Sequence, residues 1–184
     1  MPLVVCVDGV DAHVSTVRRR VIIMLKYPRL GAMKTRLLSA LGEYRACELY
    51  RALVAHTVAE ATKLSVDSEG PGAIGVRVAD APDESAARGW LGSVVSIRGE
   101  GDGNLGERRE RAIVLAFAED AEAVVVMRGD WPQFTATHLA RAFAPLAQAD
   151  TVRGPASGGG YYGFSLLPVA ACSAMECRPG VFSG

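Results

Sequence analysis

The stretch Val124-Val125-Val126-Met127-Arg128-Gly129-Asp130-Trp131-Pro132-Gln133-Phe134-Thr135, "VVVMRGDWPQFT", indicates both the fold class and the place of the site. Its apolar start, without polar alternation, is typical of a strand covered on both faces. A single carboxylate, Asp130, stands just past the end of that strand. Such a residue either binds a cation or begins an Asx-turn, and the residues alone leave both interpretations open.

Three further apolar runs, at 21–25, 73–78 and 94–97, have the same character. Between them, apolar residues recur at helical spacing over 43–64, 105–118 and 135–147, the last opening on a threonine suited to capping. Strands that alternate with helices predict an α/β fold with a mostly parallel sheet, a Rossmann-like α/β/α sandwich. Residues 160–167 predict a further strand, antiparallel at an edge of the sheet.

Composition narrows the class of protein. The chain has 184 residues, 49% of them apolar, and a formal net charge of zero, which suits one domain with a core and does not indicate a partner made of nucleic acid. No apolar run approaches the ~18–20 residues of a membrane span. Four cysteines without a C-x-x-C pair favour reduced thiols, and hence a cytoplasmic protein. We expect an N-terminal extension of undetermined order over 1–20 and the domain over 21–184.

The loop after the first of these strands, "KYPRLGAMKTRLL", is basic. Arg29, Lys34 and Arg36 crowd it, Gly31 interrupts it, and a helix follows. In a parallel α/β sheet, ligands bind at the carboxyl ends of the strands, and helix N-termini with nearby cations favour phosphates. A phosphate site and a solvated basic turn are both compatible with this loop.

Two other loops are rich in glycine. In "RGEGDGNLGERRERA" the glycines, Gly103 among them, permit close approach to a ligand, and Asn104 is placed to cap the next helix. Within that helix the spacing of Glu107 and Arg111 predicts an i,i+4 ion pair. In "RGPASGGGYYGFSLL", Gly159 and Gly160 precede a pair of tyrosines, one of which could stack on a base or sugar.

Four motifs in this order resemble one family. They are "PRLGAMKTRL" from Pro28, "NLGER" from Asn104, "GDWPQFT" from Gly129 and "GPASGGGYY" from Gly154. The chain resembles, over about 21–184, the bacterial GT-A-like nucleotide-diphospho-sugar transferases, a family long labelled as a domain of unknown function. It is also similar to the guanylyltransferases that act on phospholactate.

The resemblance implies a GT-A type of fold and a nucleotide-activated donor, either a nucleotide sugar or a nucleoside triphosphate. It implies that Mg²⁺ or Mn²⁺ binds Asp130, and that Asp130 and Tyr161 take part in catalysis. The residues that it assigns to the nucleotide phosphates are Arg29, Gly31, Lys34, Arg36, Gly103, Gly159 and Gly160.

The chain departs from the family pattern at three places. Gly158 stands where the family has an aspartate, and Asn104 stands where it has another, with Asp102 two residues before. The sequence stops at "PGVFSG", where the family's tail begins, so we expect a domain that is incomplete at its C-terminus. Glycosyl transfer, nucleotidyl transfer to a small phosphorylated acid, nucleotide binding without catalysis and a purely structural role stay open. The sequence does not predict the oligomeric state.

Overall fold

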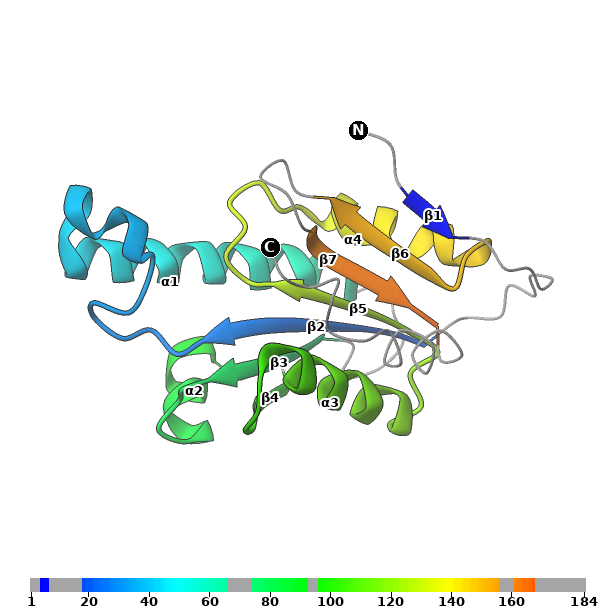
Figure 1. Ribbon diagram of the computed structural model, residues 1–184, viewed down its shortest axis with the longest axis horizontal. Coiled ribbons are helices and arrows are strands. Elements are labelled where there is room, and N and C mark those ends of the chain that lie inside the picture. The colour runs from blue at the N-terminus through cyan, green and yellow to red at the C-terminus, as the bar shows by residue number, and fades with distance from the viewer. Residues whose placement is uncertain (1–3, 7–17, 66–73, 93–95, 156–160, 168–184) are drawn as a thin grey trace.

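The strands of the chain assemble into one sheet with helices on both faces (Figure 1). A computed structural model describes residues 4–6, 18–65, 74–92, 96–155 and 161–167. The strands are β1 (Val4–Cys6), β2 (Arg19–Lys26), β3 (Ile74–Ala79), β4 (Ser96–Gly99), β5 (Ala123–Arg128), β6 (Thr151–Pro155) and β7 (Tyr161–Leu166). The helices are η1 (Thr35–Leu37), α1 (Leu38–Ser65), α2 (Glu84–Leu91), α3 (Leu105–Ala118), α4 (Ala136–Phe143) and η2 (Ala144–Ala147).

The sheet has the order β1-β6-β7-β5-β2-β3-β4 in the described part of the chain. Strands β5, β2, β3 and β4 are neighbours and run parallel. This confirms the predicted α/β class and the mostly parallel sheet. On the other side of β5, β7 and then β6 and β1 pair antiparallel.

The predicted edge position of the last strand is wrong. Strand β7 is antiparallel, as expected, but it lies between β5 and β6 inside the sheet. The sequence pattern missed β6, because "TVRGP" is short and carries a glycine and a proline, which are depleted in strands. Strand β1, from the first twenty residues, adds to the outer side of β6.

The two layers of the core follow from residue parity in the strands. In β2, Val21, Ile23 and Leu25 face the cluster that α1, α2 and α4 cover, whereas Ile22 and Met24 face α3. Strand β5 divides in the same way. Strands with both faces covered need apolar side chains at every position, which explains the unbroken runs of the sequence.

The helix boundaries agree with the sequence signals for three helices. Helix α1 is interrupted at Gly42, whose φ of 72° is left-handed, so its regular part begins at residue 43 as predicted. Helix α3 spans 105–118 as predicted, and α4 starts after Thr135 and tightens into η2 at Pro145. The short α2 was not predicted, because eight residues are too few to establish a helical period.

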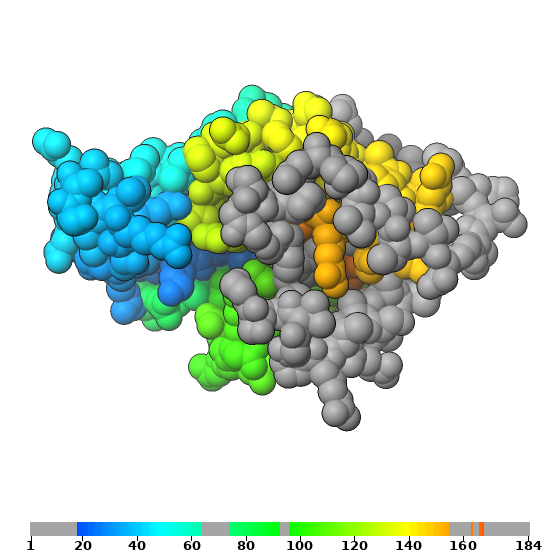
Figure 2. Space-filling model, turned by 45° about the horizontal axis from the view of Figure 1, so that its top comes forward, coloured from blue at the N-terminus to red at the C-terminus, as the bar shows by residue number. Residues whose placement is uncertain are grey.

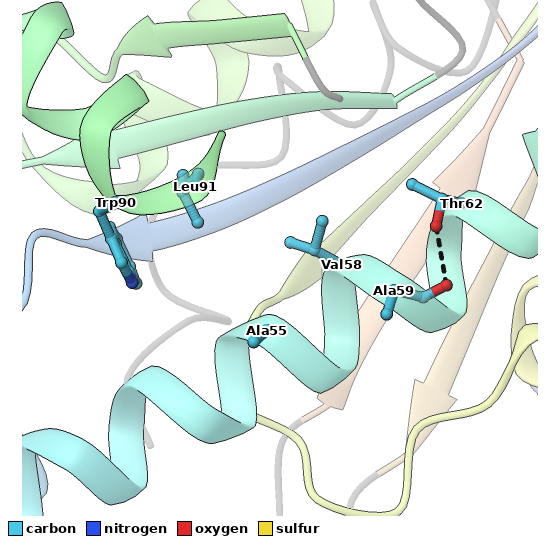
Figure 3. Close-up of a pocket in the computed structure, with 6 residues that line it drawn as sticks. All are labelled: Ala55, Val58, Ala59, Thr62, Trp90 and Leu91. Carbon is cyan, nitrogen blue, oxygen red and sulfur yellow. Dashed lines mark hydrogen bonds between the residues drawn. The ribbon is translucent and has the colours of Figure 1, made fainter. Parts of the chain in front are cut away.

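A groove lies between α1 and α2, and its Trp90 packs on Tyr27 just beyond the end of β2 (Figure 3). Its lining is Ala55, Val58, Ala59, Thr62, Trp90 and Leu91. The lining has no charged side chain, and its polar side-chain groups are the Thr62 hydroxyl and the indole N–H of Trp90. The groove is therefore poorly suited to a phosphate ligand, and the candidate site has to be sought elsewhere.

Among the residues that the structure describes, no helix combines the length and the apolar character that crossing a bilayer requires.

Candidate active site

The carboxyl ends of β5, β2, β3 and β4 meet along one edge of the sheet (Figure 1). Four loops leave from this edge, at 129–135, 27–34, 80–83 and 100–104. Crevices at such an edge are where open α/β sheets bind ligands. The strand register also places the start of β7 at this edge, because Gly163 pairs with Met127 near the end of β5.

An ion pair joins the basic loop after β2 to the loop after β5. The Nζ of Lys34 lies 2.7 Å from Oδ2 of Asp130, with the two side chains 23% and 17% exposed. Arg128 donates to the same oxygen at 3.2 Å, although its side chain is 64% exposed. One half-buried carboxylate therefore holds two cations that come from segments far apart in the sequence.

Local backbone constraints set the position of Asp130. A Cβ placed on Gly129 would overlap Cδ2 of Leu25 and come 2.9 Å from Cγ2 of Ile23, so only glycine lets β5 pass β2 at this point. Beyond Asp130, the amide of Phe134 donates to the carbonyl of Trp131 at 3.3 Å and closes a turn. The Phe134 side chain is buried and packs against Trp131, which anchors the turn to the core.

The charges around Asp130 keep it ionised. Burial alone would raise the pKa of Asp130, but the hydrogen bond from Lys34 and the charge of Arg128 outweigh it, and the pKa is lowered. Neighbouring cations stabilise a carboxylate in this way. The site therefore presents a negative oxygen between two positive groups at neutral pH.

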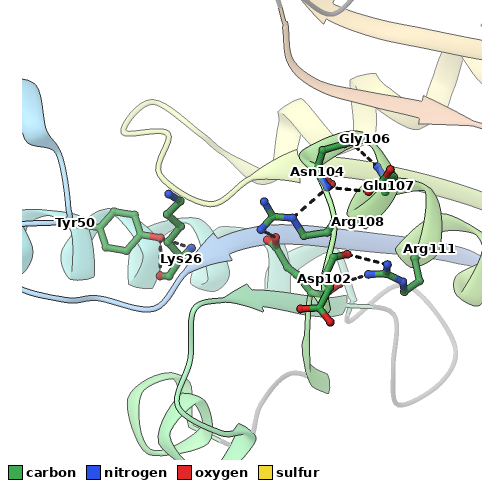
Figure 4. A network of polar contacts seen from close by, with 9 residues as sticks. Lys26, Tyr50, Asp102, Asn104, Gly106, Glu107, Arg108 and Arg111 are labelled. Carbon is green, nitrogen blue, oxygen red and sulfur yellow. Dashed lines mark hydrogen bonds and ion pairs between the residues drawn. The ribbon is translucent and has the colours of Figure 1, made fainter. Parts of the chain in front are cut away.

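Arginines of α3 hold the glycine-rich loop at 100–104 (Figure 4). Arg108 forms an ion pair of 2.9 Å with Glu100, whose side chain is 5% exposed. Arg111 donates to the carbonyls of Glu100 at 2.7 Å and Asp102 at 2.8 Å. These contacts fix the backbone of 100–104 against the start of α3.

The ion pair predicted between Glu107 and Arg111 is wrong. Glu107 instead accepts from the amide of Asn104 at 2.8 Å, while Asn104 accepts from the amides of Gly106 and Glu107. This reciprocal capping box confirms Asn104 as the N-cap of α3. Spacing alone missed it, because capping competes with the i,i+4 pair for the same carboxylate.

Among the acidic residues that the structure describes, Glu100 is the most buried. Burial raises the pKa of Glu100, and the charge and hydrogen bond of Arg108 only partly oppose this shift. Carboxyl groups with raised pKa values at a ligand-binding edge are candidates for function. The sequence placed Glu100 among glycines but did not single it out.

Tyr50 of α1 secures the start of the basic loop (Figure 4). Its hydroxyl accepts from the amide of Lys26 and donates to the carbonyl of Lys26, both at 2.9 Å. Burial raises the pKa of the Tyr50 hydroxyl, so it stays neutral and can serve both bonds. The helical spacing of the sequence indicated Tyr50 as core and gave no sign of these bonds.

The other predicted site residues have different places. Arg29 donates to the carbonyl of Asp80 at 2.5 Å, across the end of β3, rather than toward Asp130. Arg36 is exposed on η1. Gly31 and Gly103 both have positive φ angles, of 73° and 103°. These backbone conformations favour glycine and are sufficient to explain why glycine stands at both positions. Their roles toward a nucleotide stay predictions.

The fourth motif falls mostly outside the described residues. Gly158, Gly159 and Gly160 lie there, as does the side chain of Tyr161. The backbone of Tyr161 begins β7 at the ligand edge of the sheet, and its role toward a ligand stays a prediction.

The acid groups at this edge fit a metal ion only when a ligand supplies further oxygens. Among the described residues no three histidine, cysteine or acidic side chains gather into a cluster that could hold a metal. Asp130 offers one carboxylate, and Mg²⁺ commonly binds one or two carboxylates together with substrate phosphates. The residues present therefore suit an ion held between Asp130 and a diphosphate, and they do not suit a cage made by the protein alone.

The fold is that of the nucleotide-diphospho-sugar transferases. A provisionally named nucleotide-diphospho-sugar transferase from Desulfovibrio desulfuricans superposes with a TM-score of 0.74 at 26% identity, over 89% of this chain and 69% of that one. A nucleotidyl transferase from Methanothermobacter is similar with a TM-score of 0.56 at 15% identity, over 88% and 77% of the two chains. A cytidylyltransferase from Leptospira borgpetersenii gives 0.54 at 14%, over 88% and 66%.

The chain belongs to the bacterial family described as "uncharacterized protein conserved in bacteria" (DUF2064), whose model matches residues 61–181. No curated protein matches the chain at a significant level. The family and the fold confirm the resemblance that the four motifs indicated.

Proposed function

We propose that the chain transfers a sugar from a nucleotide-diphospho-sugar donor in the cytoplasm, and that Lys34 and Asp130 hold the donor diphosphate and its metal ion. The ion pair between these two residues carries the proposal. An ammonium group suits a phosphate and a carboxylate suits a divalent ion, and here the two lie 2.7 Å apart at the ligand edge of the sheet. The likeness to a provisionally named nucleotide-diphospho-sugar transferase supports the same class of donor.

The proposal gives the charged groups distinct roles. Lys34 has left-handed backbone angles (φ 47°, ψ 47°) immediately before η1, so its amide and its ammonium group both belong to the tight turn that would receive the phosphate. Asp130 and Lys34 neutralise each other without ligand. On donor binding, we expect Lys34 to turn to a phosphate oxygen and Asp130 to a divalent ion.

A divalent ion bound at Asp130 would neutralise the charge that develops on the departing nucleoside diphosphate. Arg128 and Lys34 would contribute in the same direction through their fixed positive charge. In the transfer, the bond between the anomeric carbon and the donor phosphate oxygen breaks, and a bond from that carbon to an acceptor oxygen forms. The acceptor loses a proton, and the nucleoside diphosphate leaves.

Calorimetric titration of nucleoside diphosphates, with and without Mn²⁺, tests the site. We expect Lys34→Ala together with Arg36→Ala to weaken binding at least about tenfold, since a hydrogen bond to a charged group contributes roughly 1.5–3 kcal/mol. Arg141→Ala is the matched control, because Arg141 is an exposed arginine on α4, away from the ligand edge. Equal affinities for all variants would remove the basic loop from the site.

The product distinguishes the proposed reaction from its rival. Glycosyl transfer releases a nucleoside diphosphate, whereas nucleotidyl transfer from a nucleoside triphosphate to a phosphorylated acid releases pyrophosphate. Release of pyrophosphate would replace the proposal with nucleotidyl transfer. Tight nucleotide binding without either product would assign the chain a binding role, as Gly158 in place of an aspartate suggests.

A further inference from the structure

We propose that the tip of the molecule formed by η1, the loop before it and the first turns of α1 docks on an anionic lipid surface. This tip comprises residues 26–45. The inference does not depend on the proposed transfer reaction, because it rests on exposed residues outside the Lys34–Asp130 pair.

Exposed apolar side chains concentrate at the tip. Large hydrophobic residues with exposed side chains in the described part of the chain are Leu30, Leu37, Tyr44, Leu49, Leu105 and Val114. The first three belong to the tip and Leu49 follows it directly on α1. Leu30 is 61% and Tyr44 is 70% exposed. Single exposed apolar residues are ordinary on a soluble protein, but a group of them marks an interaction surface.

The parts of the tip lie together. A Cβ on Gly31 would come 3.2 Å from the carboxylate of Glu43, so the loop that carries Leu30 is packed beside the α1 turn that carries Tyr44. The tip projects past the strand ends at one end of the molecule (Figure 1), where Figure 2 shows it as a protruding lobe of blue atoms at the left. The left-handed break at Gly42 lies within it.

The tip is also strongly basic. Apart from Lys34, which is paired with Asp130, residues 26–45 contain four lysines and arginines and a single acid, Glu43, in a chain whose formal net charge is zero. Arg29, Arg36 and Arg45 are exposed. Leucine and tyrosine side chains that insert among headgroups, ringed by cations, are the composition of surfaces that bind anionic bilayers.

Other occupants fit this surface less well. A second copy of the chain, related by a two-fold axis, would bring the basic tip against itself, where like charges repel. An acidic protein would satisfy the cations but needs no exposed leucines. The lipid surface satisfies both features, and it would bring the ligand edge, which shares the 27–34 loop, close to the membrane.

Sedimentation of the full chain with lipid vesicles tests the proposal. We expect binding to vesicles of phosphatidylcholine with phosphatidylglycerol, weakening as salt is added, and no binding to phosphatidylcholine alone. Leu30→Ser together with Tyr44→Ser should lower the partition coefficient about tenfold or more, since each change removes a large apolar side chain that would be buried in the bilayer. Val114→Ser, at a site 50% exposed on α3, should leave binding unchanged.

A charge pair completes the experiment. Arg45→Glu should reduce binding to the anionic vesicles more than Arg141→Glu, because only the first lies on the tip. No binding by the unmodified chain, or equal losses in tip and control variants, would overturn the proposal. Dimerisation in ultracentrifugation that Leu30→Ser with Tyr44→Ser abolishes would instead assign the tip to self-association. Nucleotide titration of the same variants tests the proposed function separately, because vesicle binding and nucleotide binding are measured independently.

Discussion

Asp130 has one neighbour in sequence and one in space that decide its chemistry. Gly129 gives the chain room to pass β2, and Lys34 arrives from a loop 96 residues away to meet the carboxylate at 2.7 Å. The lone acid at a strand end is therefore neither solvated nor a simple turn residue. The pairing lowers the pKa of Asp130. The free energy of unfolding should therefore depend on pH where Asp130 titrates.

Asp130→Asn should change how stability depends on pH. The folded-state pKa of Asp130 is lowered, so its contribution is present above the ordinary aspartate value of about 3.9 and is lost as pH falls through the folded value. We expect the wild type to be more stable than the variant at neutral pH, and the two to converge below about pH 4. Urea unfolding at several pH values measures this. A difference that does not vary with pH would mean that the ion pair does not stabilise the folded state.

Gly129→Ala should destabilise the fold by about 1–3 kcal/mol, the usual cost of overpacking a filled core. The new methyl group would overlap Leu25, which is buried with Ile23 beneath it. Gly89→Ala in α2 is the matched control, because nothing lies within 4 Å of its Cβ position, and alanine there should stabilise by about 0.5–1 kcal/mol. Equal effects of the two changes in thermal unfolding would contradict the steric account.

At the scale of elements, the turn before α3 joins a helix cap to a ligand loop. Asn104 accepts from two amides, and Glu107 returns a bond to the Asn104 amide. Gly101 and Gly103 adopt left-handed φ angles next to Arg111 and Glu107 respectively. The glycines of this loop are needed to wrap it around side chains of α3, whatever else they contribute to binding.

Asn104→Ala should cost about 0.5–2 kcal/mol of stability, the typical value of an N-cap, and should also weaken nucleotide binding by loosening 100–104. Asp83→Ala removes the cap of α2, which accepts from Ala86 at 2.8 Å, and should cost a similar stability but weaken binding less, because it leaves the capping box at 104–107 intact. Urea unfolding and calorimetry on both variants separate the two effects. Unchanged nucleotide affinity in Asn104→Ala would show that the loop matters only for folding.

Hydrophobic periodicity predicted the elements that are long or apolar and missed those that are short. Strand β5 and helix α3 were found because burial on both faces, or on one helical stripe, leaves a clear pattern. Strand β6 carries too few apolar residues for such a pattern, and helix α2, with eight residues, is too short for one. The interior position of β7 depends on which partners it finds across the sheet, and local sequence does not encode that choice.

The sequence predicted those site residues that are charged and follow a strand. It missed those whose importance comes from burial or from contacts made in the folded protein. Lys34 and Asp130 were named from the sequence, and the structure brings them together. Glu100 becomes unusual through burial, and Tyr50 through two bonds to the backbone of Lys26. Neither burial nor a long-range backbone contact has a signature in spacing.

At the scale of the whole molecule, the described residues gather two cations around the carboxylate of Asp130 at the ligand edge of the sheet, and they do not build a metal cage. No cluster of three ligating side chains is present among the described residues. Without ligand, Asp130 already has two cations on one oxygen. A divalent ion would therefore have to compete with Lys34 and Arg128 unless a nucleotide draws these cations to its phosphates.

This competition predicts that metal and nucleotide bind cooperatively. Mn²⁺ alone should bind weakly, and a nucleoside diphosphate should raise its affinity by about 5–150-fold, the range of a coupling free energy of 1–3 kcal/mol. Linkage requires Mn²⁺ to raise nucleotide affinity by the same factor. Calorimetry in both orders of addition measures it, and Asp130→Asn should abolish the coupling while retaining nucleotide binding in EDTA. Tight binding of Mn²⁺ to the chain without nucleotide would contradict this account. It would mean that the protein itself supplies metal ligands in addition to Asp130.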